Sequence, residues 1–169
     1  MKRLLLLRHG KSDWNVDSGT DHERPLNPRG ERAARRMGRF LAAVGAPDAV
    51  VTSTAERARA TVELAAEAGG WTCPVRATRR LYEATPSSVL EEVRAEPDTT
   101  ATLLLAGHEP TWSDLAGRLI GAGRVRMVTA AVAAIDLDVA RWSDIEPGRG
   151  VLVFLIAPKL LDAGAGDGS

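Results

Sequence analysis

Several features that would set a chain apart from ordinary globular proteins are scarce here. The 169 residues include a single cysteine, Cys73, so no disulfide can form within the chain and a reducing compartment is expected. Lysine and arginine number 22, and aspartate and glutamate also number 22, which gives a formal net charge of zero. Without excess positive charge there is no general attraction to nucleic acid or to a membrane surface, so we expect neither as a partner.

Long hydrophobic runs are missing as well. The start of the chain, Met1 to Arg3 followed by Leu4 to Leu7, resembles a signal peptide only briefly. Four leucines are fewer than the roughly 7–15 apolar residues that a signal needs. No run approaches the ~20 apolar residues of a membrane helix. These absences predict a soluble protein of the cytoplasm.

The length and composition fit one compact domain. Apolar residues make up 44% of the chain and charged residues 26%, as in ordinary globular proteins, and 169 residues leave little room for a second domain. We expect the domain to span residues 1–160. The remaining segment, 161–169, is small and polar and is predicted to be a disordered tail. The sequence leaves the oligomeric state open.

Apolar periodicity predicts strands that alternate with helices. Short apolar runs predict strands near residues 4–7, 49–52, 74–77 and 101–106. Helical spacing predicts helices near residues 33–44, 55–68, 86–94 and 112–120. Two later runs, 130–137 and 151–156, have no clear helix between them and are expected to pair antiparallel at one edge. The pattern predicts an α/β three-layer sandwich around a mostly parallel sheet.

Two of the three histidines directly follow predicted strands. His9 comes after Arg8 and precedes Gly10, and His108 comes after Gly107 at the end of the 101–106 strand. Ligands of open α/β sheets bind beyond the carboxyl ends of the strands. If the two strands are neighbours, both imidazoles face one pocket. A single histidine at a strand end is usually structural, but two of them, one beside an arginine, favour a functional site.

The chemistry of this site has two alternative interpretations. His9, His108 and Glu83 together offer ligands that zinc accepts. The neighbouring arginines would repel a cation, whereas a guanidinium matches the oxygens of a phosphate. We therefore expect an anion site without a metal or cofactor.

A third polar segment, residues 52–61, follows the second predicted strand and opens the next helix. Ser53 or Thr54 is expected to cap that helix. Arg57 lies in its first turn and can point toward the carboxyl edge of the sheet, while Arg59 faces elsewhere. On the pattern alone, a solvated surface charge explains either arginine better than a role in the site does.

Several motifs in the same order carry a family resemblance over about residues 2 to 158. They are Arg8-His9-Gly10, Lys11 to Trp14, Arg24-Pro25-Leu26, Arg29-Gly30, Ser53 to Thr61, Gly107-His108, and the late Trp142, Gly150 and Pro158. The chain resembles the histidine phosphatase superfamily, also called phosphoglycerate mutase-like, and within it the SixA-type phosphohistidine phosphatases. The resemblance implies the phosphoglycerate mutase-like fold.

The resemblance also implies roles for the matched residues. His9 would be the nucleophile and form a covalent phosphohistidine, while Arg8, Arg57 and His108 would bind the phosphoryl oxygens. A cationic His108 would suit this role, because phosphate charge raises its pKa. Asn15 lies where several relatives place a phosphate-binding asparagine, although a role in the loop turn explains it equally well.

Two positions leave the substrate open. Glu109 follows the second histidine where relatives often have asparagine, and Glu83 is the best candidate for the general acid that ester hydrolysis requires. The favoured substrate is phosphohistidine on a protein, which needs less acid assistance, and the short span after Glu83 leaves no room for a large cap. The alternatives are a small-molecule phosphomonoesterase, acting on a sugar phosphate or nucleotide with Glu83 as acid, and a non-catalytic phosphate-binding module. A mutase would need a lid, and none is found.

Overall fold

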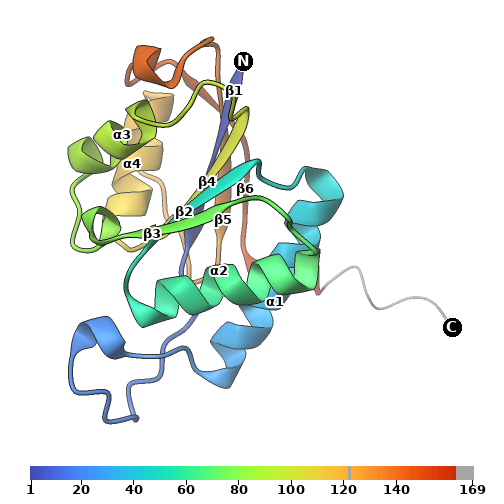
Figure 1. Ribbon diagram of the computed structural model, residues 1–169, viewed down its shortest axis with the longest axis vertical. Helices are drawn as coiled ribbons and strands as arrows, with labels where there is room; N and C mark the ends of the chain where they lie inside the picture. The colour runs from blue at the N-terminus through green and yellow to red at the C-terminus, as the bar shows by residue number, and fades with distance from the viewer. Residues whose placement is uncertain (122, 163–169) are drawn as a thin grey trace, which may run out of the picture.

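The protein is built around one six-stranded sheet with helices on both faces (Figure 1). The computed structural model describes residues 1–121 and 123–162, so most of the predicted tail, residues 163–169, lies outside the described residues. The strands are β1 (Lys2–Arg8), β2 (Ala49–Ser53), β3 (Val75–Thr78), β4 (Thr102–Gly107), β5 (Val132–Leu137) and β6 (Gly150–Ile156). The α-helices are α1 (Pro28–Val44), α2 (Glu56–Gly69), α3 (Pro86–Arg94) and α4 (Thr111–Ile120).

The strand order confirms the predicted mixture of parallel and antiparallel pairing. The sheet runs β3-β2-β4-β1-β5-β6, with parallel pairs from β3 to β1. β5 pairs antiparallel with β1, and β6 pairs antiparallel with β5 at the edge of the sheet. The parallel half therefore directs the carboxyl ends of β1, β2 and β4 toward the same edge.

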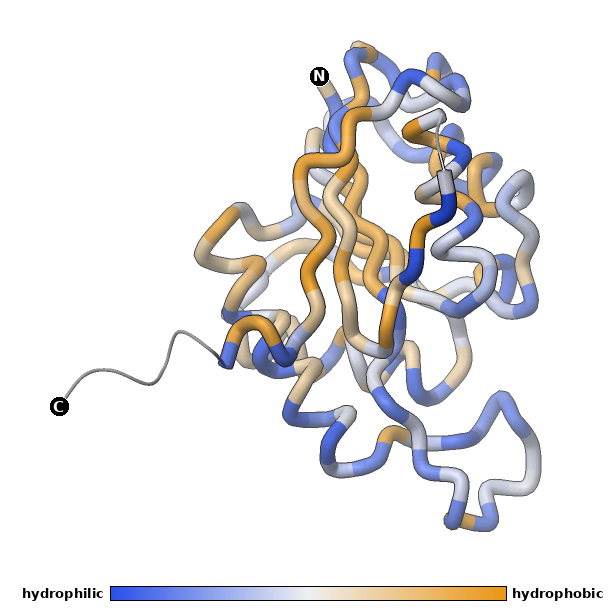
Figure 2. Tube along the Cα trace, turned by 180° about the vertical axis from the view of Figure 1, so that it is seen from behind, coloured by the Kyte–Doolittle hydropathy of each residue, from blue (hydrophilic) through white to orange (hydrophobic). Residues whose placement is uncertain are grey.

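The leucines of β1 divide the core between the two faces of the sheet. Leu4 and Leu6 pack with residues of α3 and α4, whereas Leu5 and Leu7 pack with residues of α1 and α2. All four are essentially inaccessible to solvent, as expected for a central strand covered on both sides. This confirms the three-layer arrangement. In Figure 2 the strands form the hydrophobic centre, and the loop that follows β1 is mostly hydrophilic. No helix in the described ranges is long and apolar enough to span a bilayer.

The loop after β1 folds back tightly against the start of α1. Asn27 caps α1 by accepting a hydrogen bond from the Gly30 backbone N–H at 2.8 Å, and its own backbone N–H donates to the Lys11 carbonyl at 2.9 Å. A Cβ on Gly30 would lie 2.2 Å from the Lys11 carbonyl oxygen, and one on Gly10 would lie 2.8 Å from that of Gly30. The absence of both side chains lets the loop after His9 approach the helix.

We expect Gly30→Ala to destabilise the protein by about 1–3 kcal/mol, because the added methyl must displace backbone rather than a flexible side chain. The free energy of unfolding in urea would measure this. Glu31→Ala, an exposed change in the same helical turn, is the matched control and should stay within about 0.5 kcal/mol. Equal stability of the two variants would contradict the steric argument.

Candidate active site

The pairing of β1 with β4 brings the two histidines together. The strands are parallel and in register, with Arg8 opposite Gly107, so that His9 and His108 follow at equivalent positions. Their ring centroids lie 5.2 Å apart with the planes tilted by 54°. Both line one cavity of about 800 Å³. The expectation that these strands are neighbours and share a pocket is confirmed.

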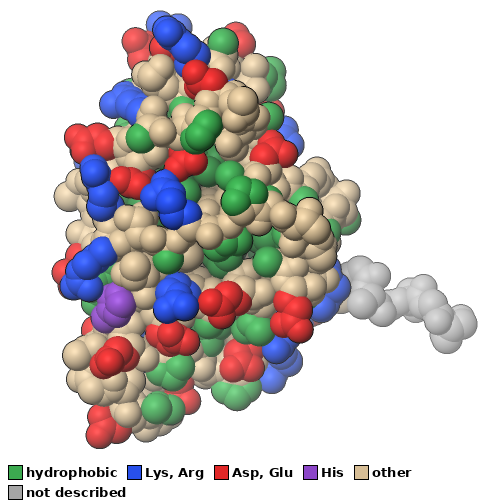
Figure 3. Space-filling view, in the orientation of Figure 1, with side chains coloured by type: hydrophobic (Ala, Val, Ile, Leu, Met, Phe, Trp, Pro, Cys, Tyr) green, Lys and Arg blue, Asp and Glu red, His purple; other side chains and the backbone are tan. Residues whose placement is uncertain are grey.

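Basic side chains dominate the lining of this cavity. Glu109 and Asp162 contribute the only carboxylates among the described lining residues. Besides Arg8 and Arg57, the basic lining residues are Lys11, Arg24, Arg29, Arg32, Arg36 and Lys159. On the face shown in Figure 3, by contrast, acidic and basic side chains are interspersed. A zero net charge therefore conceals a local concentration of positive charge.

His9 is held as one neutral tautomer. Its Nδ1 lies 2.7 Å from the Gly10 carbonyl oxygen, which can only accept, so Nδ1 carries the proton and Nε2 has a free lone pair. Burial lowers the pKa of the His9 imidazole to about 3 despite the bond to Gly10. The charges of His108, Arg57 and Arg8 contribute to this low value. No hydrogen-bond partner for Nε2 is found in the described part of the chain, so a potential nucleophile borders the cavity.

His108 is also neutral and oriented from both sides. Its Nδ1 lies 3.4 Å from the Arg57 Nη2, a group that can only donate, and its Nε2 lies 2.8 Å from the Ser53 hydroxyl. Nδ1 is therefore the acceptor and Nε2 the donor. The pKa of His108 is lowered to about 4, mainly by burial and also by the charge of Arg57, while the charge of Asp21 acts in the opposite direction.

Arg57 is buried and paired with Asp21 from the loop after β1. Its Nη1 donates to the Asp21 carbonyl at 2.7 Å, and its Nη2 lies 3.1 Å from Asp21 Oδ2. Tyr82 donates to the same carboxylate at 2.9 Å, and Arg24 at 2.6 Å. Burial raises the pKa of Asp21, but the bond from Tyr82 and the two arginines outweigh it and hold this pKa below its usual range. A single carboxylate thus orients two cavity arginines.

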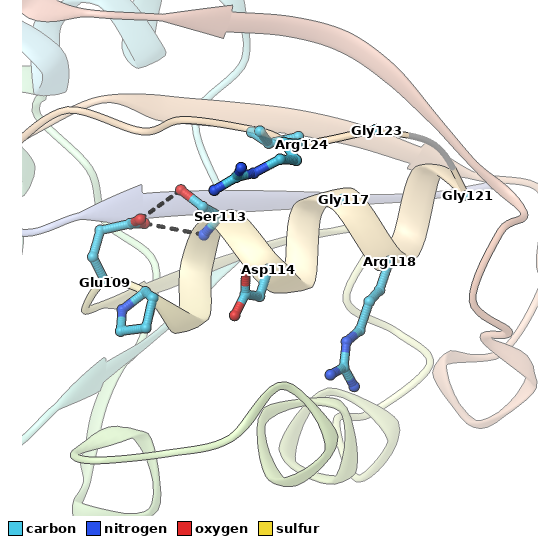
Figure 4. Close-up of a pocket in the computed structure, with 10 residues that line it drawn as sticks. Glu109, Ser113, Asp114, Gly117, Arg118, Gly121, Gly123 and Arg124 are labelled. Carbon is cyan, nitrogen blue, oxygen red and sulfur yellow. Dashed lines mark hydrogen bonds between the residues drawn. The ribbon is translucent and has the colours of Figure 1, made fainter.

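Arg8 is positioned through a chain of contacts that begins at Glu109, whose hydrogen bonds with Ser113 are drawn in Figure 4. Glu109 accepts hydrogen bonds from the backbone N–H and the hydroxyl of Ser113. The Ser113 hydroxyl oxygen in turn accepts from the Met127 N–H at 3.1 Å, and the Met127 carbonyl accepts from Arg8 Nη1 at 2.9 Å. Burial lowers the pKa of Arg8, and the charge of Glu109 partly offsets this. Glu109 therefore supports the site electrostatically.

Thr61 ties the two arginine-bearing segments together. Its hydroxyl accepts from the Gly10 backbone N–H at 2.9 Å and donates to the Arg57 carbonyl at 2.6 Å. The Thr61 side chain is buried, so this single group fixes the chain next to His9 against α2.

Some residues singled out from the sequence lie elsewhere. Glu83 is exposed, has a left-handed φ of +54°, and is not among the residues that line the cavity. Asn15 is exposed in a turn where its backbone N–H donates to the Asp13 carboxylate at 2.9 Å, and it does not line the cavity either. Arg59 faces solvent beside Glu63, as expected. The assignments of Glu83 and Asn15 stay predictions that this geometry does not favour.

The predicted N-cap of α2 is wrong. Ala55 occupies that position without a side-chain capping bond. The Ser53 hydroxyl accepts from the Ala55 N–H at 3.2 Å and lies 2.8 Å from the His108 Nε2, and the Thr54 hydroxyl lies 2.8 Å from the His22 Nε2. Two hydroxyls that the capping rule assigned to the helix therefore orient imidazoles.

Sequence reasoning missed Asp21 and Tyr82. The ring of Tyr82 lies 5.7 Å from that of His108, and Asp21 bonds Arg57 directly. The only signal was that Asp21 stands three residues before the Arg24-Pro25-Leu26 motif and Tyr82 directly before Glu83. Within the described residues, no three His, Cys, Asp or Glu side chains are grouped to hold a metal ion.

Comparison with known proteins identifies the family. The model of the histidine phosphatase superfamily (branch 1) matches residues 4–101, which is more than half of the chain. The chain belongs to the histidine phosphatase superfamily. An uncharacterized protein of Mycobacterium tuberculosis is 40% identical over 164 residues, covering 90% of this chain and all of the relative.

Solved structures of histidine phosphatases share the fold along nearly the whole chain. One from Nakamurella multipartitia, assigned as the phosphohistidine phosphatase SixA, is 31% identical with a TM-score of 0.81 and covers 93% of this chain and 96% of its own. Another with the same assignment, from Agrobacterium tumefaciens, is 25% identical with a TM-score of 0.78, covering 93% and 98%. The predicted phosphoglycerate mutase-like fold is confirmed.

The depressed pKa values of His9 and His108 predict acid sensitivity. An unfolded imidazole binds a proton below a pH of about 6.5, whereas these two stay neutral when folded down to about pH 4 for His108 and about 3 for His9. The unfolded state therefore binds more protons, and stability falls as the pH falls through this window, by at most about 1.4 kcal/mol per pH unit for each histidine.

Urea denaturation between pH 7 and pH 5 would measure this slope, and His9→Gln and His108→Gln should each reduce it. NMR titration of the two imidazole rings gives an independent reading. A slope that stays unchanged when both histidines are replaced would contradict the assignment.

Proposed function

We propose that the protein is a phosphatase in which His9 Nε2 attacks the phosphorus of the substrate. The observation that carries this proposal is the fixed tautomer of His9. Its Nδ1 proton is donated to the Gly10 carbonyl at 2.7 Å, and the depressed pKa leaves the Nε2 lone pair available at neutral pH. The P–N bond forms as the bond to the leaving group breaks. Water then attacks phospho-His9 and releases inorganic phosphate.

Arg8, Arg57 and His108 would stabilise the charge on the transferred phosphoryl group. Arg8 uses one of its five N–H donors on Met127, and Arg57 points two donors at Asp21. The phosphoryl charge would raise the pKa of His108, so that Nδ1 becomes a donor to a phosphoryl oxygen instead of an acceptor from Arg57. These groups are fixed before the reaction and need little reorganisation.

The favoured substrate is phosphohistidine carried by a protein. Both solved structures described above, which are 31% and 25% identical to this chain, are assigned to that activity. The position of Glu83 supports the same choice, because an exposed carboxylate outside the cavity is poorly placed to protonate an alkoxide. The imidazole of phosphohistidine leaves with less acid assistance. We also propose that residues 1–160 act as one domain and that the protein works in the cytoplasm.

A small-molecule phosphate ester is the second candidate. A cavity of about 800 Å³ lies within the range that accommodates small ligands. In that case Glu83, or another group, must reach the leaving oxygen in the complex.

Replacement of the nucleophile tests the mechanism. Rapid quenching of the wild-type protein during turnover should trap an acid-labile, alkali-stable phosphoprotein, and His9→Ala should abolish both this label and turnover. His22→Ala, which removes the third histidine, is the matched control and should still become labelled. Full turnover by His9→Ala would overturn the proposal.

Substrate choice is measured by kcat/KM on a phosphohistidine-bearing protein and on a panel of small esters, without added metal. A preference above about tenfold for the protein, roughly 1.4 kcal/mol in transition-state stabilisation, is expected. A comparable preference for one ester would favour the second candidate. In the same assay Glu83→Gln should slow ester hydrolysis more than phosphohistidine hydrolysis, and equal losses on both would remove Glu83 as the acid.

A further inference from the structure

The cavity holds more positive charge than the phosphoryl chemistry uses. Eight lysines and arginines line it, against the carboxylates of Glu109 and Asp162. Arg8 and Arg57 suffice for one phosphoryl group in the proposed mechanism. Arg24 is bonded to Asp21 and Ser12, and Arg36 is paired with Asp162 at 2.9 Å.

Four cations at the cavity have no such assignment. Lys11, Arg29, Arg32 and Lys159 form no ion pair with any residue in the described part of the chain. Lys11, Arg29 and Arg32 are exposed, so their charges are available to a ligand. A cavity that is lined by unpaired cations beyond its reaction centre favours a substrate with negative charge beyond its phosphoryl group.

Helix α1 presents Arg29 and Arg32 in an unusual position. With Arg36 they follow i, i+3 and i+7 spacing, which places the three on one face, while Met37 and Leu41 of the same helix are buried in the core. Arg29 and Arg32 lie in the first turns of the helix, where its dipole disfavours cations, and its last turn has no basic residue. The helix dipole therefore gives no reason for cations at these positions, whereas an external anion would bind them.

Trp14 indicates that the anion belongs to a protein. It lines the cavity, its side chain is 75% exposed, and its ring lies 3.5 Å from the Arg24 guanidinium carbon. An exposed tryptophan stacked with an arginine is typical of the residues that contribute most to protein–protein binding. A sugar phosphate would gain little from so exposed a ring, because it has no apolar or aromatic group to pack against it.

We propose that Arg29, Arg32 and Trp14 form a docking surface for an acidic segment of the phosphorylated protein. This inference rests on the proposed function and specifies its substrate: the phosphohistidine enters the cavity while flanking Asp or Glu side chains bind Arg29 and Arg32. Electrostatic binding at this surface would mainly affect association and KM, and salt would weaken it.

Two synthetic peptides of equal length, each with one phosphohistidine, test the proposal. Glutamates flank it in one peptide and glutamines in the other. We expect kcat/KM to be about tenfold higher for the acidic peptide at low salt, mainly through KM. The double variant Arg29→Gln/Arg32→Gln should remove most of this preference. Arg39→Gln, an exposed arginine of α1 that does not line the cavity, should retain it.

Equal kcat/KM on both peptides, with both dephosphorylated, would overturn the docking surface and leave the phosphatase function intact. Failure to dephosphorylate either peptide would instead count against the proposed function. In that case isothermal titration of the same peptides without phosphate still decides the inference. Tighter binding of the glutamate peptide, lost in the double variant and kept in Arg39→Gln, supports it. Equal binding of the glutamate and glutamine peptides overturns it.

Discussion

The in-register parallel pairing of β1 and β4 is the constraint on which the site depends. Because Arg8 lies opposite Gly107, the next residue of each strand is a histidine, and the two rings meet 5.2 Å apart. A shift of either strand by one residue would turn its histidine toward the opposite face of the sheet, away from the other imidazole. The buried leucines of β1, divided between two separate halves of the core, hold this register. Hydrophobic packing therefore determines the geometry of the polar site.

Burial and charge act together at the site. The same desolvation that keeps His9 neutral also raises the free energy of buried cations that have no partner. The Nε atoms of Arg8 and Arg57 are buried without a hydrogen-bond partner among the described residues. Asp21 moderates this by pairing with Arg57 and Arg24. A phosphoryl group must then bind Arg57 in the presence of a second negative charge, so Asp21 both positions the arginine and weakens its attraction for anions.

The parts of this architecture that follow from local pattern could be predicted. Short apolar runs and helical spacing indicated the strands and helices, and the two Gly and His pairs at strand ends indicated where the site would form. The network around Asp21 could not be predicted, because an aspartate in a loop rich in turn residues looks like a turn former, and its contact with Arg57 depends on how the loop folds over α2. Glu83 shows the opposite case. The family resemblance made it the candidate acid, but its backbone is left-handed and its side chain is exposed outside the cavity.

The Thr61 hydroxyl links local unfolding of α2 to that of the loop after β1. The Thr61 oxygen accepts from the Gly10 N–H beside His9 and its hydroxyl donates to the Arg57 carbonyl within α2, so unwinding of this turn of α2 removes the acceptor of the Gly10 N–H. Both partners are buried, which makes an unpaired state costly. Local opening of this turn of α2 should therefore also release the Gly10 amide, which would exchange with solvent through the same fluctuation.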